Sequence, residues 1–80
     1  MRVVFSDHAW DDFCYWMEHD RKIAARVVLL IRDIQRQPFE GLGKPEPLRH
    51  DLAGFWSRRI TDQHRLVYAV ERDQILVAQA

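Results

Sequence analysis

Residues 44–65, KPEPLRHDLAGFWSRRITDQHR, mark the point at which an irregular loop gives way to strand-like sequence. The stretch holds five Lys or Arg residues, three acidic residues and two histidines. Polar side chains at the start of adjacent strands can converge on one spot of a sheet. We therefore expect a functional site in this stretch, with Glu46 and Arg65 at its centre.

The residues before this stretch predict two helices. After Ser6, a natural N-cap, four apolar residues recur at i, i+3, i+4 and i+7, and these are Trp10, Phe13, Cys14 and Met17. After Asp20, a second N-cap candidate, comes another apolar stripe, formed by Ile23, Val27, Leu30, Ile31 and Ile34. Because almost no linker separates the two helices, they should form an antiparallel hairpin.

Strand-like sequence lies at both ends of the chain, in residues 2–5, 55–61, 64–70 and 75–80. Residues 38–47 hold all three prolines and two of the three glycines, which predicts a loop after the second helix. One strand, two helices and then three or four hairpin-linked strands favour an α+β fold. We expect a single domain over residues 1–80, with an antiparallel sheet and the two helices packed on one of its faces.

The composition narrows the class of protein. The longest apolar run, residues 27–31, is far too short to span a membrane. One cysteine, Cys14, cannot form an internal disulfide, which favours a cytoplasmic protein. The four histidines and Cys14 show no ligand spacing, and no cofactor motif is present, so neither a metal nor a cofactor is expected.

Charge is uneven along a chain whose formal net charge is zero. Residues 7–20 carry five acids and no Lys or Arg, whereas residues 21–36 carry five Lys or Arg and one acid. A neutral chain can still present a basic face, and a phosphate responds to the local potential. The alternative is that an acidic and a basic helix merely solvate their outer faces.

The alternation of side chains along a strand constrains which face of the sheet the arginines of this stretch occupy. Adjacent residues of a strand point to opposite faces, so either Arg58 or Arg59 must face away from the helices. If that arginine joins Arg65, two guanidinium groups lie on the open face of the sheet. Guanidinium groups donate in a rigid fork that suits phosphate oxygens.

Glu46 adds a possible general base, because Pro45 and Pro47 stiffen the backbone around its carboxylate. A base, cations and an acid suffice for metal-free cleavage of RNA through its 2′-hydroxyl. The alternative is a surface ion pair of Glu46 with Lys44 or Arg49, worth roughly 0–1 kcal/mol.

Two segments carry a resemblance to a known family. The run PFEGLGKPEPLRHDLAGFWSRRITDQHRLVYAV, residues 38–70, and SDHAWDDFCYW, residues 6–16, closely resemble the YoeB (Txe) toxins of the RelE superfamily of bacterial toxin–antitoxin systems. The resemblance covers essentially all 80 residues. It implies the microbial-ribonuclease-like fold, with a twisted antiparallel sheet of about four to five strands.

The resemblance also implies an activity, which is metal-independent cleavage of mRNA in the ribosomal A site. The general base of the family falls on Glu46 and its phosphate-stabilising arginine on Arg65. The residues expected to contact RNA are Arg59, Arg49, Lys44 and Arg58. The expected partner is a YefM-like antitoxin, and operator DNA would be bound only through the complex with it. A homodimer is compatible with the family.

Family members end with a tail of the type Arg-Tyr-His-Tyr, whose histidine would be the general acid. The sequence given ends at Ala80, where that tail should begin. We therefore expect the 80-residue form to be attenuated.

One alternative to the ribonuclease is a non-catalytic module that binds the antitoxin and tunes repression. Another is a gyrase-directed toxin, against which the Glu46 and Arg65 pair argues.

Overall fold

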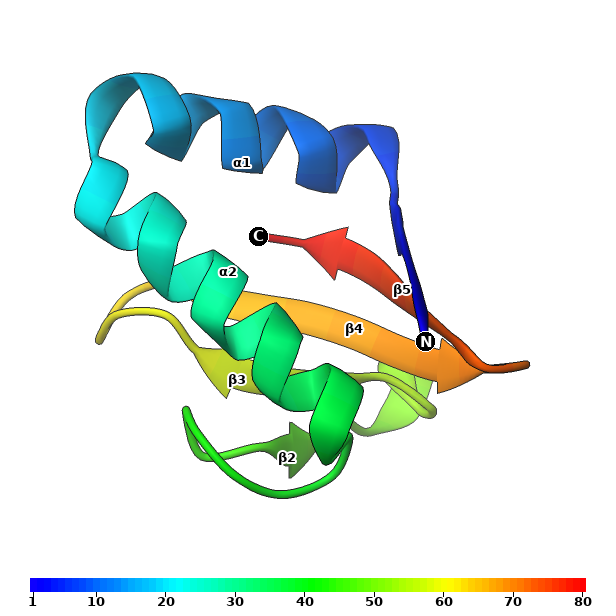
Figure 1. Cartoon of the computed structure of the whole chain (residues 1–80). Coiled ribbons are helices and arrows are strands. Elements are labelled where there is room, and N and C mark those ends of the chain that lie inside the picture. The colour runs from blue at the N-terminus through cyan, green and yellow to red at the C-terminus, as the bar shows by residue number, and fades with distance from the viewer.

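The computed structural model describes residues 1–80 and contains two helices, five strands and one short 3-10 helix. Their order places one strand before the helices and four after them (Figure 1). The elements are β1 (Arg2–Phe5), α1 (Asp7–His19), α2 (Arg21–Arg36), β2 (Glu46–Pro47), η1 (His50–Leu52), β3 (Trp56–Arg59), β4 (Arg65–Glu71) and β5 (Gln74–Gln79).

Both helices begin where the capping residues predict. Ser6 Oγ accepts a hydrogen bond from the Ala9 amide at 3.0 Å. Asp20 Oδ1 accepts one from the Ile23 amide at 3.3 Å. These bonds satisfy amide groups that the first turn of a helix leaves unpaired. The two N-cap predictions are confirmed, and Asp20 lets α2 follow α1 directly.

The five strands form one sheet in the order β1-β5-β4-β3-β2. The pairs β2–β3, β3–β4 and β4–β5 are antiparallel, as expected of strands joined by short connections. The pair β1–β5 is parallel, so the sheet is mixed. The expectation of a wholly antiparallel sheet is therefore wrong for this pair. Two helices separate β1 from the other strands, and no tight turn therefore sets its direction.

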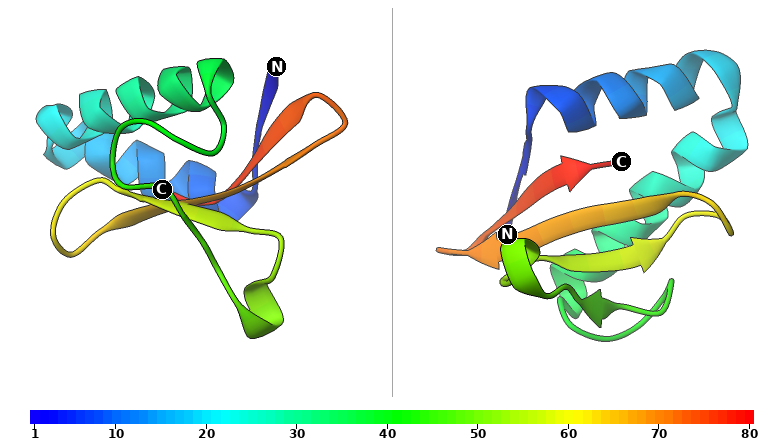
Figure 2. Two further views of the ribbon diagram at one scale, coloured as in Figure 1. Left: turned by 90° about the horizontal axis from the view of Figure 1, so that it is seen from below. Right: turned by 180° about the vertical axis from the view of Figure 1, so that it is seen from behind.

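Both helices lie on one face of the twisted sheet, as the left view of Figure 2 shows. The apolar stripe of α2 supplies four buried residues to the core, which are Val27, Leu30, Ile31 and Ile34. The inward face of β4 and β5 supplies four more, which are Leu66, Tyr68, Ile75 and Val77. The predicted stripe of α2 and the predicted fold class are confirmed, with the helices leaving the other face of the sheet open.

The apolar face of α1 is the predicted one only in part, because Phe13 packs against the core as expected but two other residues of the stripe do not. Trp10 and Met17 are 52% and 41% exposed, whereas Ala9 is buried and Trp16 packs against the core. Helix α1 lies over β5 and the end of the chain, where the Trp16 indole donates to the Ala80 carbonyl at 2.9 Å. In this orientation Ala9 and Trp16 face inward. Neither helix of the structure is long and apolar enough to cross a membrane.

Candidate active site

The open face of the sheet brings Glu46 and Arg65 together across three strands. Glu46 on β2 pairs with Ser57 on β3, and Arg59 on β3 pairs with Arg65 on β4. Arg65 Nη1 donates to Ser57 Oγ at 3.2 Å and to Glu46 Oε1 at 3.4 Å. The two residues placed at the centre of the site by sequence are therefore in direct contact.

The position of Glu46 depends on a very short strand. Strand β2 has two residues and lies at the edge of the sheet, where Pro47 is tolerated because an edge residue can do without an amide donor. Hydrogen bonds to β3 and to the residue before it flank Glu46 on both sides. The Arg59 amide donates to the Gly43 carbonyl at 2.7 Å, and the Leu48 amide donates to the Phe55 carbonyl at 2.8 Å.

The contact between Glu46 and Arg65 is open to water. Their side chains are 58% and 41% exposed. An ion pair of this kind contributes roughly 0–1 kcal/mol, because water screens it. Either group can therefore exchange its partner for a substrate at little cost. A carboxylate beside an exposed guanidinium can accept a proton from a hydroxyl while the guanidinium binds a neighbouring phosphate.

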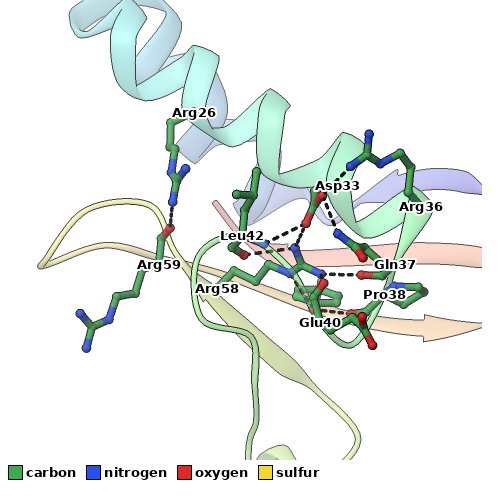
Figure 3. A network of polar contacts seen from close by, with 10 residues as sticks. Arg26, Asp33, Arg36, Gln37, Pro38, Glu40, Leu42, Arg58 and Arg59 are labelled. Atoms are coloured by element: carbon green, nitrogen blue, oxygen red, sulfur yellow. Dashed lines mark hydrogen bonds and ion pairs between the residues drawn. The ribbon is translucent and has the colours of Figure 1, made fainter.

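Arg59 is the second arginine of the open face. It lies directly opposite Arg65 in the antiparallel pair of β3 and β4. Figure 3 shows its side chain extending away from helix α2, and only its backbone is hydrogen-bonded, with the carbonyl accepting from Arg26 Nη2 at 3.4 Å. Its guanidinium forms no ion pair. Two arginines at paired positions give this face a positive potential that suits a phosphate.

Lys44 and Arg49 lie on either side of β2 and are exposed. Neither side chain makes a hydrogen bond or ion pair, so the structure does not bring them into contact with Glu46 or Arg65. Lys44 adopts a positive φ of 53° in the turn that follows Gly43. Their assignment as RNA contacts stays a prediction.

Arg58 contradicts the prediction that it binds RNA. It is 0% exposed and faces the helices, opposite Leu66. Its Nε donates to the Tyr68 hydroxyl, and its two terminal nitrogens donate to Asp33 Oδ2 and to carbonyl groups of the loop after α2 (Figure 3). These five bonds use all five donors of a guanidinium. None remains for a substrate, and burial bars access to it.

The partner of Arg58 is Asp33, which the sequence analysis missed. It is 4% exposed, and its Oδ2 accepts from Arg58 Nη1 at 2.6 Å and from the Leu42 amide at 3.0 Å. Its Oδ1 accepts from Gln37 at 3.1 Å and from Arg36 at 3.3 Å. A signal was available, because Asp33 is the one acid in residues 21–36 and lies beside Ile34 on the apolar stripe.

The same contacts set the ionisation of the buried pair. The hydrogen bond from the Leu42 amide, aided by those from Arg58 and Gln37, lowers the pKa of Asp33 from 3.8 to about 2, although burial acts to raise it. Burial raises the pKa of Tyr68 above its ordinary value of 10.0. The carboxylate is therefore charged and the phenol neutral at physiological pH.

Acid should weaken the fold through Asp33. Since its folded-state pKa lies below the unfolded value, its contribution is fully present above about pH 4 and is lost as the pH falls through about 2. A shift of this size corresponds to about 2 kcal/mol of the free energy of unfolding. Urea titrations at stepped pH, with the Asp33 carboxyl carbon followed by NMR, check this. A midpoint near 4 for that carbon in the folded protein would contradict it.

Comparison with known proteins gives the family. Residues 5–80 match a protein family described as "YoeB-like toxin of bacterial type II toxin-antitoxin system". The chain belongs to the YoeB toxin family. It is 56% identical to Toxin YoeB of Escherichia coli strain K12 over 78 residues, which cover 98% of this chain and 93% of that protein. The chain is thus a toxin of a type II toxin–antitoxin system.

Solved structures agree with this membership. A YoeB/ParE toxin from Agrobacterium tumefaciens has a TM-score of 0.97 and 46% identity, over 99% of this chain and 94% of that one. A heterotetrameric YoeB–YefM complex and a YoeB dimer, both from Staphylococcus aureus, each have a TM-score of 0.95 and 38% identity, over 100% of this chain and 93% of theirs. The predicted microbial-ribonuclease-like fold of the YoeB family is therefore confirmed.

A cavity of about 570 Å³ adjoins Arg65 on the side of α1. Its lining includes His64, Trp16 and Ala80, and the His64 ring meets Trp16 edge to face at 4.9 Å. The amide of Ala80 donates to Asp12 Oδ2 at 3.1 Å, so the carboxyl end of β5 is fixed beside this cavity. Any residues attached after Ala80 would start close to Arg65.

No group of three or more His, Cys, Asp or Glu side chains is arranged to hold a metal ion.

Proposed function

We propose that this toxin is a ribosome-dependent endoribonuclease that cleaves mRNA in the A site without a metal ion. The observation that carries the proposal is the contact of Glu46 with Arg65 on an exposed face of the sheet, with Arg59 directly opposite Arg65. A base and two cations in one open patch are what attack by a 2′-hydroxyl on its neighbouring phosphate requires. Translation inhibition in the cytoplasm would follow from such cleavage.

In the proposed reaction Glu46 takes the proton of the 2′-hydroxyl. The freed oxygen forms a bond to the adjacent phosphorus, and the bond from phosphorus to the 5′-oxygen breaks, which leaves a 2′,3′-cyclic phosphate. Arg65 and Arg59 stabilise the negative charge that builds on the phosphate oxygens. A general acid protonates the departing 5′-oxygen. Lys44 and Arg49 would bind the flanking RNA backbone.

The general acid is proposed to come from the Arg-Tyr-His-Tyr tail of the family. The proposal is supported by the position of Ala80, which lines the same cavity as Arg65 and follows Gln79, whose side-chain amide donates to the Arg65 carbonyl at 3.1 Å. Loss of a general acid costs ~10²–10⁴-fold in rate. We expect a polypeptide limited to residues 1–80 to be attenuated to that extent relative to one extended by the tail.

The solved structures of relatives indicate which molecules this toxin would bind. The solved YoeB–YefM complex supports a YefM-like antitoxin as the partner. Operator DNA would be bound only through that complex. The solved YoeB dimer supports a homodimer of this chain.

A translation extract tests the proposal. The 80-residue chain and a version extended by Arg-Tyr-His-Tyr are added, and new mRNA 5′ ends are mapped at stalled codons. Cleavage should be strong with the extended chain and ~10²–10⁴-fold slower with the short one. Arg65→Ala in the extended chain should abolish most cleavage, whereas Arg2→Ala, which removes an exposed arginine at the far edge of the sheet, should not.

Each other result has a defined meaning. Intact mRNA with the extended chain would remove the ribonuclease proposal. Tight antitoxin binding in the same preparation would then favour the non-catalytic co-repressor module. Inhibition of DNA supercoiling would instead favour a gyrase-directed toxin.

A further inference from the structure

The loop between α2 and Glu46 is tied to the inner face of the sheet by a single side chain. Arg58 Nη2 donates to the carbonyl oxygens of Gln37 and Glu40 at 2.7 and 2.8 Å. Its Nη1 donates to the Leu42 carbonyl at 3.1 Å. Arg58 is thus the common donor to three carbonyl groups of residues 37–42, as Figure 3 shows.

Asp33 and Tyr68 complete this attachment. Asp33 Oδ2 binds both Arg58 and the Leu42 amide, so it fixes the guanidinium and the loop at once. The Tyr68 hydroxyl accepts from Arg58 Nε at 3.2 Å and donates to the Pro38 carbonyl at 2.7 Å. The loop anchor, by which we mean Asp33, Arg58 and Tyr68, leaves none of its buried polar side-chain atoms without a partner.

Two glycines of the loop lie in close contact with the loop anchor and the core. A Cβ atom at Gly43 would lie 3.0 Å from Leu30 Cδ2 and 3.1 Å from Arg58 Cβ. At Gly41, where φ is +115°, a Cβ atom would overlap Asp33 Oδ2. Glycine is therefore required at both places, by contact as well as by backbone conformation.

The loop anchor is linked to the candidate active site through strand β3 and through Gly43. Arg58 stands between Ser57 and Arg59 on β3, and both of these neighbours face the open side of the sheet. Gly43, at the end of the anchored loop, accepts the Arg59 amide. Strand β2 has only two residues, so its own pairing with β3 is limited. The anchored loop must therefore supply much of what holds Glu46 beside β3.

We propose that Asp33, Arg58 and Tyr68 are positioning residues for the reaction, holding Glu46 in place through the loop of residues 37–44. The proposal rests on the proposed function, since it takes Glu46 as the base. The loop anchor touches no substrate. It acts by fixing the backbone before Glu46, and misplacement of a catalytic group by about 1 Å can cost about 10²-fold in rate.

Tyr68→Phe tests the anchor gently, because it removes one hydroxyl and keeps the buried ring. The matched control is Ile75→Val, a small change in the same core on β5, away from the loop. Both variants are made in the tail-extended chain and compared at equal folded fraction. Amide hydrogen exchange is read at Arg59 and Leu48, whose bonds to Gly43 and Phe55 flank Glu46.

In Tyr68→Phe we expect exchange at these two amides to be about tenfold faster than in Ile75→Val. Single-turnover cleavage on programmed ribosomes should fall about tenfold or more. The affinity for those ribosomes should not change, because no RNA-facing group is altered. Ile75→Val should match the wild type in all three measurements.

Two results would overturn the proposal. One is unchanged exchange at Arg59 and Leu48 in Tyr68→Phe, and the other is an equal fall in cleavage for both variants. If the wild type cleaves no mRNA, the proposed function fails, and the exchange measurement still decides whether the anchor holds the segment around Glu46.

Discussion

Replacement of Glu46 by glutamine should lower the single-turnover rate of mRNA cleavage by ~10²–10⁴-fold in the tail-extended chain. Glutamine has nearly the same shape, and its side-chain oxygen can still accept the hydrogen bond that Arg65 donates at 3.4 Å. It cannot accept the proton of a 2′-hydroxyl. Because the carboxylate is 58% exposed, the folded structure should not change. Rates are measured on ribosomes programmed with a defined codon in the A site.

Glu40→Gln is the matched control for this change. Glu40 lies in the loop before β2 and is exposed, and only its backbone carbonyl is bonded, by Arg58. The same chemical substitution at this position should leave the rate unaltered. If both variants slow cleavage alike, the loss reflects the charge of the loop rather than a base at position 46.

Arg58→Met should lower the free energy of unfolding by about 3–5 kcal/mol. The change leaves the Asp33 carboxylate buried without its main charged partner, and it removes the donor to three carbonyl groups. Domains are typically stable by only about 5–15 kcal/mol, so this is a large fraction of the total. Urea unfolding followed by tryptophan fluorescence measures the loss.

Arg59→Met provides the comparison at the next residue of the same strand. Its guanidinium is partly exposed and unpaired, and surface substitutions usually stay within about 0.5 kcal/mol. The double variant Asp33→Leu with Arg58→Met should recover part of the loss, because no charge is then left buried alone. Equal losses in Arg58→Met and Arg59→Met would refute the role given to the buried pair.

Glu46 and Arg65 could be placed in one site from the stretch they share and from the family resemblance, but their contact depends on strand β2, because residues 38–47 were expected to be a loop. The alternation of side chains along a strand placed Arg58 and Arg59 on opposite faces, but it did not say which of them faces inward. That choice depends on the register between β3 and β4, which sets Arg58 opposite Leu66. A register is fixed by the packed core, and a single sequence does not supply it.

Asp33 and part of the inner face of α1 were missed for a related reason. A lone acid on an apolar stripe is explained only by its partner, and Arg58 lies 25 residues away in the chain. The orientation of α1 involves contacts with the last strand, among them the bond from Trp16 to Ala80, 64 residues apart. The spacing of apolar residues describes one helix at a time, so it does not predict contacts with residues that are distant in the sequence.

The short strand that carries Glu46 has a further effect on how copies of the protein meet. An unpaired strand at the edge of a sheet is a template for pairing with another chain, and proline at an edge weakens that tendency. Pro45 and Pro47 have no amide hydrogen, so of residues 45–47 only Glu46 offers a donor. The two prolines thus limit self-association through the edge at which the Glu46 carboxylate lies exposed.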